Sequence, residues 1–152
     1  MNKSTFVYVT YIRTTPEKLW SSLTTSEFIK QYWFGMDCIS DWQPGSPWKL
    51  VFSDGRVADA GEILEANPPA RLVIKWQNQW NEEMKAEGHT VCTFEIEAAP
   101  DIGPKAVKLS VTHTMDRQDS KFIGAVSGGW PKILSNLKSL LETGETVLAR
   151  SK

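Results

Sequence analysis

Large apolar side chains recur at helical spacing in the segment GGWPKILSNLKSLLETG, residues 128–144. The set consists of Trp130, Ile133, Leu134, Leu137, Leu140 and Leu141. Spacings of three and four residues place these side chains on one broad stripe of an α-helix, which has to be buried against another apolar surface. The pattern therefore predicts a helix over 128–144, with Gly128 and Gly129 at a tight start, Pro131 in the first turn and Gly144 at the end.

Most of the remaining chain alternates between apolar and polar residues, which is the pattern of strands with one dry and one wet face. The alternating segments are 5–13, 48–52, 57–66, 71–76, 89–98 and 105–115. The pair Asp54-Gly55 between the second and third segments predicts a hairpin turn. The sequence Asn67-Pro68-Pro69 predicts the next turn, because proline cannot continue a ladder of hydrogen bonds.

Two short helices are predicted after the first strand. Thr15 can cap the first helix with its hydroxyl, and Pro16 suits the first helical position. The residues Thr-Thr-Ser at 24–26 offer a second cap, and Gly35 suits the end of the second helix. The order of strand, two helices, antiparallel strands and long helix is α+β architecture, in which only the last helix is long enough to cover the sheet.

Three stretches resemble a known family, namely TTPEKLWSSLTTSEFIKQYWFG, GEILEANPPARLVIKW and GGWPKILSNLKSLLETG. In order and spacing they resemble the bacterial homologues of the activator of the heat-shock-protein-90 ATPase, within the START-like, or birch-pollen-allergen-like, superfamily of helix-grip folds. The resemblance spans nearly the whole chain and implies a single domain over residues 1–152. It implies a curved antiparallel sheet gripping a long C-terminal helix, two short helices closing one end, and a cavity between sheet and helix.

Composition agrees with one ordinary domain, since 41% of the 152 residues are hydrophobic and 23% are charged. The formal net charge of -1 gives no electrostatic reason to expect nucleic acid or an anionic membrane as partner. No apolar run approaches the roughly 20 residues of a membrane span, and the N-terminal segment alternates like a strand rather than forming a signal peptide. We therefore expect a cytoplasmic protein with no membrane span and no nucleic-acid partner.

Signatures of common catalytic chemistry are missing from the sequence. It contains no G-x-G-x-x-G, phosphate-loop, H-E-x-x-H or G-x-S-x-G motif. Cys38 and Cys92 are isolated, with no metal-type clustering with His89 or His113, and are interpreted as small buried thiols. We expect no cofactor, no metal and no catalytic residue, and an enzyme of the aromatase or polyketide-cyclase kind is the less favoured interpretation.

Seven tryptophans are unusually many for a chain of 152 residues and indicate a large apolar interior. Such rings either pack on one another or line an apolar pocket, which flat rigid side chains do well. Trp80, in a polar stretch, is interpreted as an exposed lid or partner contact. The predicted ligand-binding residues are Trp33, Phe34, Trp48, Trp76, Phe94, His113, Trp130, Ile133 and Leu137.

His113 is the one polar residue that the alternation places on an apolar face, opposite the long helix. It is either a group that contacts a ligand or transfers a proton, or a core histidine hydrogen-bonded to its surroundings, and the second is the commoner case. Asp59 and Glu62 lie near the inner face of the segment 57–66. No role is assigned to them, because Gly61 indicates a β-bulge that would reverse the alternation.

Two functions from different classes follow from the pattern and the resemblance. The first is binding of a small hydrophobic ligand, such as a lipid, in the cavity between sheet and helix. The second is a protein-interaction module of the chaperone ATPase-activator type, with a chaperone as partner. An apolar or basic patch on the outer face of the sheet would favour the second, but the outward residues look like an ordinary solvated surface. They are Lys75, Glu95, Glu97, Lys108 and Thr112.

Overall fold

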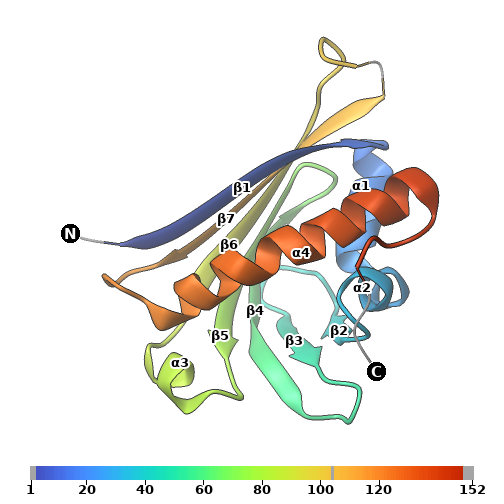
Figure 1. The fold of residues 1–152 in the computed structure, drawn as a ribbon. Helices are drawn as coiled ribbons and strands as arrows, with labels where there is room; N and C mark the ends of the chain where they lie inside the picture. Colours follow the sequence, from blue (N-terminus) through green and yellow to red (C-terminus); the bar gives the residue numbers. More distant parts are fainter. Residues whose placement is uncertain (1–2, 104, 149–152) are drawn as a thin grey trace.

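The computed structural model describes residues 3–103 and 105–148, which form seven strands and four helices (Figure 1). The strands are β1 (Ser4–Arg13), β2 (Asp37–Ser40), β3 (Pro47–Val51), β4 (Val57–Asn67), β5 (Arg71–Asn78), β6 (Thr90–Ala98) and β7 (Ala106–Met115). The helices are α1 (Pro16–Thr24), α2 (Ser26–Tyr32), α3 (Glu82–Ala86) and α4 (Lys121–Thr143).

All the described strands join one antiparallel sheet in the order β1-β7-β6-β5-β4-β3-β2. The sheet is curved, and α4 crosses its concave face, with α1 and α2 near one end of that helix and α3 near the other (Figure 1). The α+β prediction and the helix-grip arrangement are thus confirmed. None of the helices in the described part of the chain has the length and apolarity of a membrane span.

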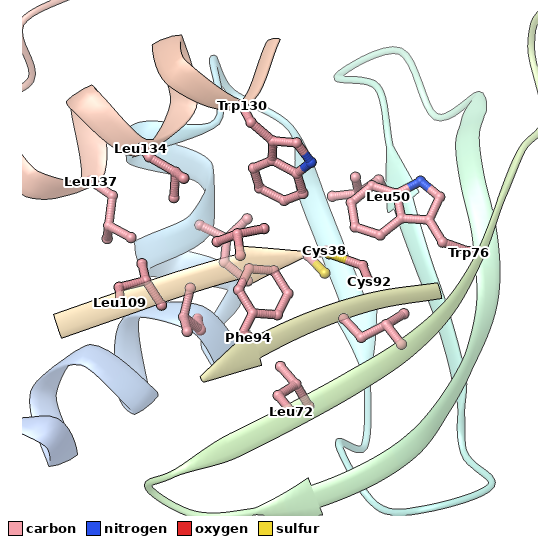
Figure 2. Close-up of a cluster of buried hydrophobic side chains, with 14 of the residues drawn as sticks. Cys38, Leu50, Leu72, Trp76, Cys92, Phe94, Leu109, Trp130, Leu134 and Leu137 are labelled. Atoms are coloured by element: carbon pink, nitrogen blue, oxygen red, sulfur yellow. The ribbon is translucent and has the colours of Figure 1, made fainter. Parts of the chain in front are cut away.

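The core lies between the inner face of the sheet and α4. Side chains of β7 alternate strictly, so that every second residue from Val107 to Met115 is buried, as the sequence pattern predicts. Figure 2 shows Trp130, Leu134 and Leu137 extending from α4 toward the sheet, and all three are at most 2% exposed. The apolar stripe predicted on the C-terminal helix therefore covers the sheet.

The start of the long helix differs from the prediction. It begins at Lys121 rather than at Gly128, so that Gly128, Gly129 and Pro131 all lie inside it. The prediction was wrong because the glycine pair was interpreted as a break. Each glycine disfavours a helix by only about 1 kcal/mol, which burial of the preceding Phe122 and its neighbours outweighs.

Capping from a distant part of the chain fixes that earlier start. The Ser120 side chain accepts a hydrogen bond from the Ile123 N–H (3.1 Å). The Glu87 carboxylate accepts from the Ser120 hydroxyl (2.6 Å) and from the Lys121 N–H (2.8 Å). An anion at this position also complements the helix dipole. The residue that completes the cap follows α3, far from α4 in sequence.

Two short elements, β2 and α3, were not predicted. In β2 only Cys38 is buried, so four residues carry too little pattern to be recognised. Helix α3 lies in the polar stretch after Trp76 and is capped by Asn81, whose side chain accepts from the Met84 N–H (3.0 Å). Helix α2 ends at Tyr32, before Gly35.

Candidate functional site

A cavity of about 180 Å³ lies between the first half of α4 and the inner face of strands β3 to β5. From α4 it is lined by Phe122, Ala125, Val126, Gly129, Trp130 and Ile133. From the sheet it is lined by Leu50, Asp59, Trp76 and Asn78, and it is completed by Trp33, Trp80 and Met84. Trp80 is 58% exposed and therefore lies at the mouth of the cavity.

Three tryptophans form one wall, and they come from the end of α2, from β5 and from α4. The ring centroids of Trp33 and Trp130 are 5.2 Å apart, those of Trp76 and Trp130 are 5.8 Å apart, and those of Trp33 and Trp76 are 6.0 Å apart. The two pairs that include Trp130 are edge-to-face, the arrangement that the ring quadrupoles favour. Each ring is held by two others, so the wall is rigid before any ligand arrives.

Gly61 of β4 allows a fourth tryptophan to support this wall. It lies between Trp48 of β3 and Trp76 of β5 in the strand register, and the rings of these two tryptophans are 4.3 Å apart. A Cβ atom at Gly61 would lie 1.7 Å from the Lys75 carbonyl oxygen. Only glycine fits there, and Gly61 therefore has a packing role. The register shifts of β4 lie elsewhere, at Ile63–Glu65 against β5 and opposite Leu50–Val51 of β3.

His113 is fully buried, and both of its ring nitrogens are hydrogen-bonded. The Trp130 Nε1–H donates to Nδ1 (3.1 Å). Because Nδ1 accepts, Nε2 carries the proton and donates to the Thr90 hydroxyl (2.8 Å), which in turn donates to the Trp76 carbonyl (2.9 Å). Burial lowers the pKa of His113 to about 3. This is the arrangement of a neutral core histidine, and it fixes the orientation of the Trp130 ring.

The polar groups of the cavity come from Asp59 and its neighbours on β5. The Asn78 Nδ2 donates to the Asp59 carboxyl at a long 3.4 Å. Burial raises the pKa of Asp59 to about 6, while the side chains of Trp76 and Asn78 have smaller, opposite effects. No ion pair within residues 3–103 and 105–148 includes Asp59. Desolvation therefore dominates this carboxyl.

The indole N–H of Trp76 is also unsatisfied. Its Nε1 is buried, and among the described residues it has no acceptor at hydrogen-bonding geometry. Its effect on the pKa of Asp59 indicates that it lies near that carboxyl. Buried donors without a partner are rare in folded proteins, and each calls for an explanation.

Four of the nine predicted site residues line the cavity, namely Trp33, Trp76, Trp130 and Ile133. The other five lie outside its lining. Trp48 packs against Trp76, and the ring centroid of Phe94 lies 5.7 Å from that of Trp130. His113 and Leu137 are buried in the core. Phe34 follows α2 with a positive φ of 53° and is half-buried.

Asp59, Asn78 and Met84 line the cavity without having been predicted to do so. Asp59 and Gly61 lie on the same face of β4 as the buried Ile63, because the strand has no bulge between Asp59 and Ile63. Asn78 continues the series of buried residues in β5 by one step beyond Trp76. Both residues could have been found in the sequence by extending the alternation of inward and outward residues further along each strand.

A larger hollow of about 480 Å³ lies at the surface near the end of β1 and is lined by Tyr11, Arg13, Lys105 and Glu142 among others. The Glu142 carboxylate accepts from the Arg13 N–H and from Lys138, each at 2.8 Å. The acidic group of this hollow therefore already has partners, and Tyr11 is the one aromatic side chain that lines it, so the smaller cavity with its tryptophan wall is the better candidate site. The described residues contain no group of three or more His, Cys, Asp or Glu that could hold a metal ion.

The sequence matches a family model described as Activator of Hsp90 ATPase homolog 1-like protein over residues 13–142. The chain belongs to this family. The resemblance noted in the sequence is thereby confirmed, and with it the START-like helix-grip fold. Among functionally curated proteins, no sequence matches the chain.

Solved structures share the fold over nearly the whole chain. Protein MLL2253 from Mesorhizobium loti is 24% identical, with a TM-score of 0.76 over 90% of this chain and 96% of that one. PFC0360w from Plasmodium falciparum, an HSP90 activator, is 22% identical, with a TM-score of 0.72 over 91% of this chain and 96% of that one. DynU16, from the dynemicin biosynthetic locus, is 16% identical, with a TM-score of 0.72 over 94% of this chain and 49% of that one. At these identities the likeness establishes the fold alone.

Proposed function

We propose that this family member binds a small hydrophobic molecule in the cavity between α4 and strands β3 to β5. The observation that carries the proposal is the cavity of about 180 Å³ behind a rigid wall of three tryptophans. Apolar cavities of about 150 Å³ in other proteins stay dry and bind benzene. The size favours a molecule with one ring over a sterol or a whole lipid.

Rigidity of the wall supports the same conclusion. A ligand that enters a preformed apolar site gains contact area without the loss of side-chain entropy that a mobile site would impose. Trp80 lies at the mouth, 6.2 Å from the Phe52 ring, where it can cover a bound molecule. We place the protein in the cytoplasm as a binding protein, with no cofactor and no catalytic residue.

Two glycines of α4 allow a matched test of the proposal. A Cβ atom added at Gly129 or at Gly128 meets no atom within 4 Å, but only Gly129 lines the cavity. Gly129→Leu should fill the site and Gly128→Leu should not, while both changes raise helix propensity by a similar amount. We would titrate one-ring aromatics such as toluene and p-cresol and follow tryptophan fluorescence.

Wild type and Gly128→Leu should show saturable binding of at least one compound, and Gly129→Leu should bind it at least about tenfold more weakly. Failure of every compound to bind wild type would remove the proposal. Equal binding by both variants would place the bound molecule somewhere other than this cavity.

The second candidate is an interaction module that activates a chaperone ATPase, which family membership and the likeness to the Plasmodium activator both favour. One observation on this chain supports it. Strand β1 lies at the sheet edge, and Val7, Val9 and Tyr11 on its outer face are 57%, 46% and 39% exposed. Exposed apolar rows of this kind are typical of contact surfaces.

The two functions predict opposite variant sensitivities. A chaperone activator should stimulate a purified heat-shock-protein-90 ATPase, and Val7→Asp with Val9→Asp should abolish the stimulation while Gly129→Leu preserves it. A ligand-binding protein should lose binding with Gly129→Leu and keep it with the two strand substitutions.

A further inference from the structure

We propose that the ligand of this cavity carries a hydroxyl group on a single aromatic ring, and that this hydroxyl donates to the Asp59 carboxylate and accepts from the Trp76 Nε1–H. The inference rests on the proposed function and specifies its ligand class as a small phenol or aromatic alcohol. The groups that would orient it lie together at one end of the cavity.

Strand register explains why these groups converge. Asp59 of β4 pairs with Asn78 of β5, and Trp76 lies two residues earlier on the same face of β5. All three line the cavity, whose other lining residues are apolar. The arrangement is a mostly apolar site with a small polar end, which is typical of sites that orient a ligand by a single functional group.

The hydrogen-bonding capacity at this end is only partly used within the described chain. The Trp76 residue is 3% exposed, yet its Nε1–H has no acceptor. The side-chain oxygen Oδ1 of Asn78 already accepts a hydrogen bond from the Asn81 N–H (2.9 Å). Asp59 is 9% exposed and receives the long bond from Asn78 together with a weaker interaction from the Trp76 side chain, which does not reach hydrogen-bonding geometry. One buried donor and one buried acceptor therefore face the same region without satisfactory partners.

Only some ligand chemistries satisfy both groups. A hydroxyl is a donor and an acceptor at one oxygen, so it can serve Asp59 and Trp76 together. An alkylammonium group would pair with Asp59 and leave the Trp76 N–H unpaired. A carbonyl would accept from Trp76 but would present a second acceptor to an ionised Asp59. A plain hydrocarbon would leave both groups unsatisfied.

Ionisation of Asp59 gives the inference a pH signature. None of the other lining residues, which come from β3, β5, α3 and α4 and from the segments after α2 and β5, is titratable. His113, packed against Trp76, is neutral because burial lowers its pKa to about 3. The pair Glu83–Lys121 lies outside on α3 and α4 and is exposed. Burial raises the pKa of Asp59 to about 6, so affinity for a hydroxyl should increase as the pH rises through 6.

The test compares four ligands of similar size on the intact protein at pH 7.5. They are p-cresol, toluene, 4-methylbenzaldehyde and 4-methylbenzylamine, titrated by calorimetry or tryptophan fluorescence. We expect p-cresol to bind at least about tenfold more tightly than toluene, since one charge-assisted and one neutral hydrogen bond are added. That preference should weaken between pH 7.5 and pH 5, while toluene binding stays unchanged.

Two variants remove one polar group each. Asp59→Asn and Trp76→Phe should reduce the preference for p-cresol over toluene to about threefold or less. The matched control is Glu62→Gln, which makes the same chemical change on β4 outside the cavity and should leave the preference intact. Should Trp76→Phe fail to fold, Asp59→Asn and the wild-type pH profile still decide.

Each outcome separates this inference from the proposed function. Equal binding of p-cresol and toluene overturns the hydroxyl assignment and leaves the hydrophobic site standing. Preferred binding of 4-methylbenzylamine would mark a cation site, and preferred binding of 4-methylbenzaldehyde that tightens at low pH would mark a protonated Asp59; either overturns the assignment. If no compound binds, including toluene, the proposed function itself fails.

Discussion

At the scale of single residues, Asp59 combines burial with the absence of a cationic partner in the described chain. Its pKa rises from an ordinary 3.8 to about 6 on folding, because burial disfavours the ionised form. Between these values the folded protein holds a proton that the unfolded chain has lost. Stability contributed by this residue is therefore present at low pH and decreases as the pH rises toward 6.

Asp59→Asn removes this pH-dependent penalty. The free energy of unfolding of the variant, relative to wild type, should increase between pH 4 and pH 7.5 by roughly 3 kcal/mol, from a pKa difference of about two units. Urea denaturation at the two pH values measures it, with Glu62→Gln as the control that shows no such increase. A constant difference at both pH values would mean that Asp59 is solvated and ionises normally.

Adding a single methyl group at Gly61 should greatly lower the stability of the fold. Gly61→Ala places a Cβ atom 1.7 Å from the Lys75 carbonyl oxygen, and backbone cannot move aside as a flexible side chain can. Overpacking of this kind should cost roughly 3 kcal/mol or more of unfolding free energy.

Gly128→Ala is the matched comparison for Gly61→Ala, since an added Cβ at Gly128 meets nothing within 4 Å. It should leave stability unchanged or raise it by up to about 1 kcal/mol, because alanine favours a helix. Thermal or urea denaturation of both variants tests the pair. Similar stabilities for the two would show that β4 and β5 are not in close approach at Gly61.

At the scale of elements, α4 holds the fold together through its buried stripe. Leu137 is 0% exposed, within the core under this helix. Leu137→Asp should cost roughly 3 kcal/mol or more, because it buries a carboxylate in an apolar contact. Lys132→Asp, at an exposed position of the same helix, should change stability by less than about 1 kcal/mol. A Leu137→Asp protein that melts within a degree or two of wild type would contradict the placement of α4.

Local patterns of the sequence predicted the central elements well, because buried stripes and alternating faces repeat over many residues. They failed where the deciding interaction is not local. The start of α4 depends on Glu87, which lies beyond α3 and cannot be recognised as a cap from the residues around Ser120. The β2 strand is too short to show alternation and exists because β3 pairs with it.

At the scale of the whole molecule, the site is assembled from distant segments, which limits what a sequence can predict. Trp130 and Ile133 were identified because helical spacing directs them to the sheet, and Trp76 because its strand alternates. Whether an inward residue lines a void or fills it depends on its neighbours across the core. His113 points inward as predicted, but Thr90 and Trp130 occupy its nitrogens.

Folding of the whole domain should be independent of metal, disulfide and nucleotide. Cys38 and Cys92 are free and buried, and burial raises the pKa of Cys38 to about 12, which keeps its thiol unreactive. Chelator, reductant and nucleotides should each leave the melting temperature within about 1 °C of its value without them. A shift of several degrees with any of them would reveal a binding site for that agent in the folded protein.

Gly129 has a consequence for how relatives of this protein diverge. A larger residue there stabilises the helix and shrinks the cavity at once, since glycine is the weakest helix former apart from proline and an added side chain finds open space. Selection for stability alone therefore drives this position away from glycine in any lineage that does not use the cavity. On the proposed function, relatives that keep a small residue at this point of the helix are expected to be those in which a ligand exerts selection, and a comparison of sequences would separate the two groups.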